Sequence, residues 1–114
     1  IVRACDDILA GELHDCFVVD IIQGGAGTST NMNANEVIAN RALEYLGHPR
    51  GAYHELHPVE HVNMSQSTND VYPTAIKVAL QSKINLLIDA MGVLQEAFEK
   101  KAEESDDNPP PREG

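Results

Sequence analysis

The sequence is poor in aromatic residues and in cysteine. Tryptophan is absent from the 114 residues, and aromatic residues make up only 4% of them. Such a chain builds its core from Leu, Ile, Val and Ala, as helical proteins often do. Cys5 and Cys16 are too few for a disulfide framework, and their spacing fits no zinc ribbon. We therefore expect two reduced thiols in a cytoplasmic protein.

Positive charge is also scarce, because 8 Lys and Arg residues face 18 Asp and Glu residues, for a net charge of -10. This balance argues against nucleic acid and against anionic membranes, which are bound by clusters of basic residues. No apolar run approaches the roughly 20 residues that span a bilayer, and no signal-peptide pattern is present. An acidic protein can still bind a small dianion through local donors.

Apolar residues recur at helical spacing in three regions. The spacing predicts helices over Ile1–Ala10, over Asn31–Leu46 and from Ile76 to about Ala102. Gly11 and Gly47 are natural stops for the first two helices.

The third region carries one continuous apolar stripe, and Pro73 suits its first turn. A helix this long and this apolar needs several partners, so we expect it to join a larger helical bundle. The stripe consists of Ile76, Leu80, Ile84, Leu87, Met91, Leu94 and Phe98.

The remaining segments lack helical periodicity. Phe17–Ile22 is a β-branched run that predicts a buried extended segment or a strand. Residues 48–66 are expected to be irregular, with Pro58 breaking any helix there. Residues 105–114 are acidic and then proline-rich, which predicts a disordered tail.

Two polar loops stand just before predicted helices. Helix N-termini attract anions through free backbone N–H groups, and hydroxyl or amide side chains add neutral donors. Simple helix capping is the alternative for either loop, but two such clusters in one short chain favour a functional site. The loops are Gly24-Gly25-Ala26-Gly27-Thr28-Ser29-Thr30-Asn31-Met32-Asn33 and Asn63-Met64-Ser65-Gln66-Ser67-Thr68-Asn69-Asp70.

Other site types fit less well. A dinucleotide fingerprint fails because Thr30 occupies the place of its third glycine, and no Gly-Lys-Ser/Thr follows for a P-loop. His57 and His61 are four residues apart, but Pro58 and the lack of ligand-spaced partners favour hydrogen-bonded loop histidines over a metal site.

The two loops resemble the signature regions of the aspartase/fumarase superfamily, and the match runs from about Ile1 to Glu104. Fumarases usually have Gln after the Gly-Thr pair and Ser-Ser-Asn in the second loop, so Ser29 and Thr68 favour the aspartase branch. The densest matches are Gly27-Thr28-x-x-Asn31-Met32-Asn33-x-Asn35-Glu36 and His57-Pro58-x-x-His61-Val62-Asn63-x-Ser65-Gln66-Ser67-Thr68-Asn69-Asp70.

The resemblance implies a mainly α fold in a homotetramer whose active sites each draw on three subunits. Residues 1–66 would form the latter part of an N-terminal domain. Residues 67–104 would begin the central helical bundle, and residues 105–114 would be a tail. The chain is thus expected to be a fragment of a longer enzyme.

The resemblance also implies the reversible deamination of L-aspartate to fumarate and ammonia, with no cofactor. Thr28, Ser67 and Thr68 would hold the carboxylate beside the carbon that loses its proton, and Asn69 would contact the amino group. The family's base is a serine on a Gly-Ser-Ser loop that this sequence lacks. We therefore expect no catalytic residue and no metal ligand here, and no activity of the fragment alone.

Two alternatives remain open at this point. The chain could belong to a class II fumarase. It could instead be a non-catalytic helical assembly module that keeps the two loops only as helix caps.

Overall fold

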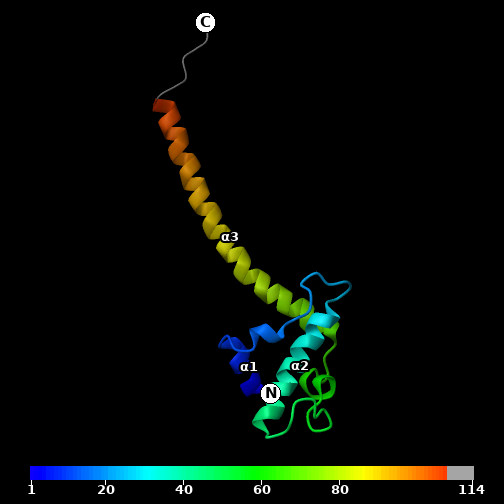
Figure 1. Cartoon of the computed structure of the whole chain (residues 1–114). Helices are drawn as coiled ribbons and strands as arrows, with labels where there is room; N and C mark the ends of the chain where they lie inside the picture. Colours follow the sequence, from blue (N-terminus) through cyan, green and yellow to red (C-terminus); the bar gives the residue numbers. More distant parts are fainter. Residues whose placement is uncertain (108–114) are drawn as a thin grey trace. The chain divides into compact units, whose positions relative to one another are not determined.

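The computed structural model describes residues 1–107, and these contain helices and irregular segments but no strand. The chain divides into two compact units, Ile1–Ile76 and Lys77–Gly114. The presence of helices without any strand in residues 1–107 confirms the expectation of a mainly α fold. Three α-helices are present in the described residues (Figure 1): α1 (Val2–Leu9), α2 (Thr28–Tyr45) and α3 (Thr68–Asp107). Two short helical turns, η1 (His14–Cys16) and η2 (Pro58–Val62), complete the set.

The predicted glycine stops end α1 and α2. Gly47 adopts a left-handed conformation with φ of 79°, which glycine tolerates without a steric penalty. Its N–H donates to the carbonyl of Glu44, and the N–H of His48 donates to that of Leu43, which satisfies two terminal carbonyls of α2. The chain leaves α1 at Gly11 in the same way.

The structure corrects two expectations about proline. Pro58 does not abolish helical structure, because it takes the first position of η2, where its missing N–H is not needed. Pro73 lies inside α3 rather than in its first turn, because α3 begins earlier, at Thr68. At its far end α3 continues to Asp107, so residues 105–107 of the expected tail are helical. The rest of that tail lies outside the described residues.

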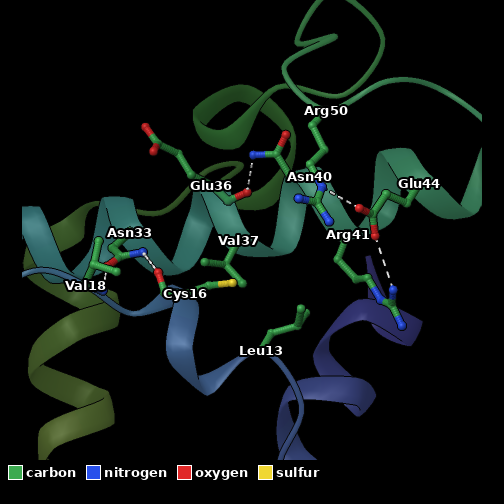
Figure 2. Close-up of a pocket in the computed structure, with 10 residues that line it drawn as sticks. All are labelled: Leu13, Cys16, Val18, Asn33, Glu36, Val37, Asn40, Arg41, Glu44 and Arg50. Atoms are coloured by element: carbon green, nitrogen blue, oxygen red, sulfur yellow. Dashed lines mark hydrogen bonds and ion pairs between the residues drawn. The ribbon is translucent and has the colours of Figure 1, made fainter.

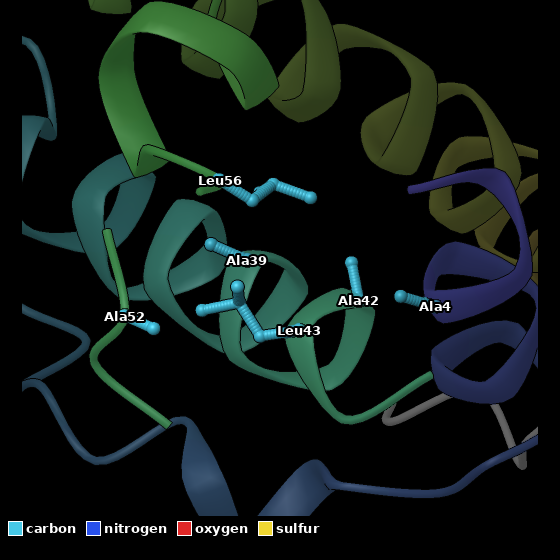
Figure 3. Packing of buried hydrophobic residues seen from close by; sticks show 6 residues of the cluster. All are labelled: Ala4, Ala39, Ala42, Leu43, Ala52 and Leu56. Carbon is cyan, nitrogen blue, oxygen red and sulfur yellow. The ribbon is translucent and has the colours of Figure 1, made fainter. Parts of the chain in front are cut away.

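The first unit has a small core built mainly from alanine (Figure 3). Leu43 is its only large side chain that is completely buried among the described residues. The close packing of α1 against α2 follows from Ala4 and Ala42, whose short side chains let the two backbones approach. The core residues are Ala4, Ala39, Ala42, Leu43, Ala52 and Leu56.

The segment Phe17–Ile22 is neither a strand nor buried, contrary to expectation. Ile21 is 93% exposed and Ile22 is 85% exposed. A β-branched run becomes a strand only where a neighbouring strand pairs with it, and the described residues supply none. What fixes its start is a side chain of α2, because Asn33 accepts hydrogen bonds from the N–H groups of Val18 and Val19.

Helix α3 has no buried residue along its described length of 40 residues. The predicted stripe lies on this helix and is exposed from Ile76 to Phe98. Despite its length, neither α3 nor any other helix of residues 1–107 combines enough length and apolar character to cross a membrane.

Candidate functional site

Three of the four predicted binding residues stand at the start of α3. The N–H of Asn69 donates to Ser67 Oγ at 3.1 Å, and the N–H of Ser67 donates to a carboxylate oxygen of Asp70 at 3.2 Å. This reciprocal pair is a capping box, and it fixes Thr68 as the first residue of α3. The capping hypothesis for Ser67 therefore has a structural basis. Its hydroxyl proton is not used in this bond and can still be donated to a ligand.

Thr28, the fourth predicted residue, is the first residue of α2. The helix starts three residues before the expected Asn31, and no side chain caps its N-terminus. The N-cap position belongs to Gly27, which is in the left-handed conformation with φ of 76°. The first N–H groups of α2 thus point out of the helix end with the partial positive charge of its dipole.

The two helix starts meet through an aromatic ring. A Cβ atom on Gly27 would overlap the side chain of Tyr72, which stands one turn into α3. Gly27 is buried, and Tyr72 is partly buried. The contact places Thr28, which follows Gly27, in the same region as the start of α3, and nothing in the sequence indicated this contact.

A buried group of three amides holds the second loop against α2. Asn31 and Asn35 both donate to Asn63 Oδ1, at 2.9 and 3.2 Å. Asn63 in turn donates to the carbonyl of Gln66 at 2.6 Å, immediately before Ser67. All three asparagines are at most 8% exposed. Each of the three amide nitrogens has a partner within the protein, and the cluster holds the residues before Ser67 against α2.

The four predicted residues share a chemical character. Each offers a neutral donor, none is a cation, and each belongs to the first turn or the cap of a helix. Such a set can bind a carboxylate with hydroxyl, amide and backbone N–H groups in place of a salt bridge.

An ionic cluster lies elsewhere in the first unit and joins α1 to α2. Arg41 Nε lies 2.6 Å from Asp7, and its other nitrogens reach Glu12 and Glu44. The Tyr45 hydroxyl, and then Arg41, lower the pKa of Asp7 by stabilising its charged form. Arg50 and Arg41 lower the pKa of Glu44 in the same way.

A hollow of about 310 Å³ opens beside this cluster (Figure 2). It lies along α2 and contains none of the four predicted binding residues. Three of its four charged side chains are engaged with one another, because Arg41 and Arg50 both bind Glu44. Its lining residues are Leu13, Cys16, Val18, Asn33, Glu36, Val37, Asn40, Arg41, Glu44 and Arg50.

His61 of η2 and His57, the residue that caps η2, both accept hydrogen bonds from the backbone. Nδ1 of His57 accepts hydrogen bonds from the N–H groups of Val59 and Glu60, and Nδ1 of His61 accepts from the N–H of His57 at 2.7 Å. The Nδ1 atoms of both rings are thus engaged by backbone N–H groups. Within residues 1–107, no cluster of three or more potential His, Cys, Asp or Glu ligands occurs.

Comparison with known proteins decides the family. A family model described as Lyase matches residues 1–111. The chain belongs to this lyase family. The similarity to the aspartase/fumarase superfamily that the two loops indicated is thereby confirmed.

Its relatives include aspartate ammonia-lyases. The enzyme of Helicobacter pylori is 58% identical over 104 residues, which cover 91% of this chain and 22% of that protein. The enzyme of Escherichia coli is 53% identical over 108 residues, covering 94% of this chain and 23% of that protein. The chain thus spans less than a quarter of the length of the curated relatives it matches.

A solved structure shows the same fold. The native form of fumarate lyase:delta crystallin from Brucella melitensis is 63% identical, with a TM-score of 0.78. The likeness covers 90% of this chain and 24% of that protein. A cobalt-bound structure of the Brucella melitensis protein superposes with a TM-score of 0.80.

Sequence reasoning missed the residues that hold the site together. Asn31 and Asn35 are four residues apart, so they share one face of a helix, and this spacing was the available signal for a common partner. No comparable signal pointed to Tyr72, because nothing in its spacing relates it to Gly27.

Proposed function

We propose that this chain supplies the carboxylate-binding part of an aspartate ammonia-lyase. In the complete protein it would take part in the reversible deamination of L-aspartate to fumarate and ammonia. The observation that carries the proposal is the meeting of two helix N-termini, one with Thr28 and the other with Ser67, Thr68 and Asn69. The chain is 53–58% identical to aspartate ammonia-lyases of two species, and this similarity supports the choice of reaction.

The neutral donors suit the chemistry. A base removes a proton from C3 of aspartate, and the electron pair moves into the adjacent carboxylate, which becomes an enediolate dianion. Thr28, Ser67 and Thr68 would bind that group, and they would bind the dianion more tightly than the substrate monoanion. Interactions that strengthen as charge develops accelerate the step. Asn69 would contact the amino group that leaves as ammonia once the bond between C2 and nitrogen breaks.

The base itself is not assigned to this chain. The family's Gly-Ser-Ser loop has no counterpart in residues 1–114, so the proposal places only binding residues here. The exposed apolar stripe of α3 supports a homotetramer in which neighbouring subunits complete each site. The reaction as proposed uses no cofactor.

The first test is a turnover assay on the complete protein with L-aspartate and with L-malate, following fumarate. We expect fumarate from aspartate only. Fumarate from malate only would overturn the deaminase assignment and indicate a fumarase. Turnover of neither substrate would overturn the proposed function as a whole.

A pair of variants separates ligand binding from capping at Ser67. Ser67→Ala removes the cap and should cost about 1 kcal/mol of stability. Ser67→Asp keeps a good cap but places a negative charge at the carboxylate site. We expect Ser67→Asp to unfold like the wild type and to lose aspartate turnover. If Ser67→Asp kept full turnover, Ser67 would be a cap and nothing more.

A further inference from the structure

The contact between Gly27 and Tyr72 has no role in the reaction as written above. Gly27 is buried, and any added Cβ would overlap the Cδ1, Cε1 and Cζ atoms of the Tyr72 ring. The backbone of Gly27 therefore lies directly against the face of the ring. Contacts this close leave little freedom for either partner, because packed interiors lack spare volume.

The contact sits between the two groups of binding residues. Gly27 immediately precedes Thr28, so its backbone fixes where α2 begins. Tyr72 is four residues after Thr68 in α3, so these two side chains share a helix face. The ring thus joins the face that carries Thr68 to the residue that carries the start of α2.

A second restraint holds the residues that precede Ser67 in the sequence. Asn63 is tied to α2 by two buried amides and holds the carbonyl of Gln66, the residue before Ser67. The run Ser67–Asn69 is therefore bracketed by the amide cluster before it and by the ring after it. With the amide cluster fixing one end, the ring remains to set the spacing at the other.

We infer that Tyr72 is a positioning residue, whose ring sets the spacing between the Thr28 and Ser67–Thr68 donors that bind the substrate carboxylate. The inference rests on the proposed function. Because a misplacement of about 1 Å in a site can lower turnover on the order of 100-fold, loss of the ring should act on catalysis more than on folding.

The experiment uses the complete protein and measures kcat and KM for L-aspartate in three single variants. Tyr72→Ala removes the ring and should lower kcat/KM at least about tenfold, mainly through kcat, since the dianion needs the donors most closely placed. Tyr72→Phe keeps the ring and should restore kcat/KM to within about twofold of the wild type. Tyr53→Ala is the matched control, a partly buried tyrosine packed on the core, and it should lower Tm without the fall in kcat.

A double-mutant cycle tests the contact itself without relying on activity. Gly27→Ala should lower Tm in the wild-type background, because its Cβ meets the ring and its φ is strained. In the Tyr72→Ala background the same change should lower Tm less, since the space is vacant. Equal effects in the two backgrounds would show that Gly27 and Tyr72 do not pack as described.

The outcomes also distinguish this inference from the proposed function. An active wild type whose Tyr72→Ala variant keeps kcat/KM within about twofold overturns the inference and leaves the function standing. A wild type that converts neither aspartate nor malate overturns both. A Tyr72→Phe variant as impaired as Tyr72→Ala would move the role from the ring to the hydroxyl and so also contradict the inference.

Discussion

Helix α2 and the part of α3 beyond Ile76 use their side chains in opposite ways. In α2, five residues are buried, and two of them are the asparagines Asn31 and Asn35. In α3 none is buried, although its apolar stripe is much the stronger pattern in the sequence. A regular apolar pattern in the sequence therefore does not indicate how many side chains of a helix are buried within this chain.

The difference lies in where the partners come from. The polar residues of α2 find their partners within the first unit, in Asn63 and in the backbone of residues 16–19. The stripe of α3 has no partner in the described residues, and apolar surface of this extent on a helix calls for one. Helix α2 is thus packed within the first unit, whereas the stripe of α3 remains uncovered in the described residues, as the proposed tetramer would require.

The largest expected effect is on assembly. A charge placed in the stripe by Leu87→Glu would be buried without a counter-ion in a bundle, at a cost of several kcal/mol, on the order of that for other unpaired buried charges. We expect the complete protein to dissociate, as measured by light scattering. Ser82→Glu adds the same charge on the opposite face and should leave the mass unchanged.

Light scattering on the 114-residue chain sharpens the same comparison. With its stripe uncovered, the chain should self-associate. Two outcomes would show that the stripe is not an assembly surface. In the first, the Leu87→Glu variant of the complete protein keeps the wild-type mass, as Ser82→Glu is expected to do. In the second, the isolated 114-residue chain is a stable monomer.

The amide cluster should matter next. Asn63→Leu removes the amide acceptor of both Asn31 and Asn35, and Asn35 then keeps only the weak Met32 sulfur. The loss should be about 2–6 kcal/mol, since each unpaired buried donor costs roughly 1–3 kcal/mol. Denaturant unfolding of the complete protein measures this loss. Asn85→Leu, at an exposed amide of α3, should change stability by no more than about 0.5 kcal/mol. Equal losses at the two positions would remove the distinction between the helices.

The sequence predicted what depends on local spacing. The mainly α fold, the glycine ends at Gly11 and Gly47, and the third helix follow from periodicity and from helix-stop chemistry, and the structure confirms them. The role of Pro73 was predicted wrongly, because the capping box of Ser67 and Asp70 starts α3 before the proline. Burial of Phe17–Ile22 was wrong as well, since burial depends on partners far away in the chain or outside it.

The site was predictable only in part, for the same reason. Family resemblance pointed to Thr28 and to Ser67–Asn69, and the structure brings these residues into one region, while their binding roles stay predictions. The contact of Tyr72 with Gly27 joins residues 45 positions apart, a separation at which single-sequence patterns carry no information. Only the folded arrangement of α2 and α3 reveals it.

The smallest expected effect is the dependence of stability on pH at the ionic cluster. Hydrogen bonds from the Tyr45 hydroxyl and from Arg41 lower the pKa of Asp7 below its ordinary value of 3.8, and Arg50 and Arg41 lower that of Glu44 below 4.5. A carboxyl whose pKa is lowered by folding stabilises the protein above its ordinary pKa, and this contribution is lost as the pH falls through the lowered value. The loss should therefore begin near pH 4.5 and continue below 3.8.

Tyr45→Phe removes the largest cause of the lowered pKa of Asp7. The unfolding midpoint of this variant should therefore fall below that of the wild type near pH 7 and converge with it in acid. Tyr53→Phe loses a hydroxyl that accepts a hydrogen bond from Asn40 instead, so its deficit should be the same at every pH. A constant deficit for Tyr45→Phe as well would mean that Tyr45 stabilises the α1–α2 contact by packing and not through the charge of Asp7.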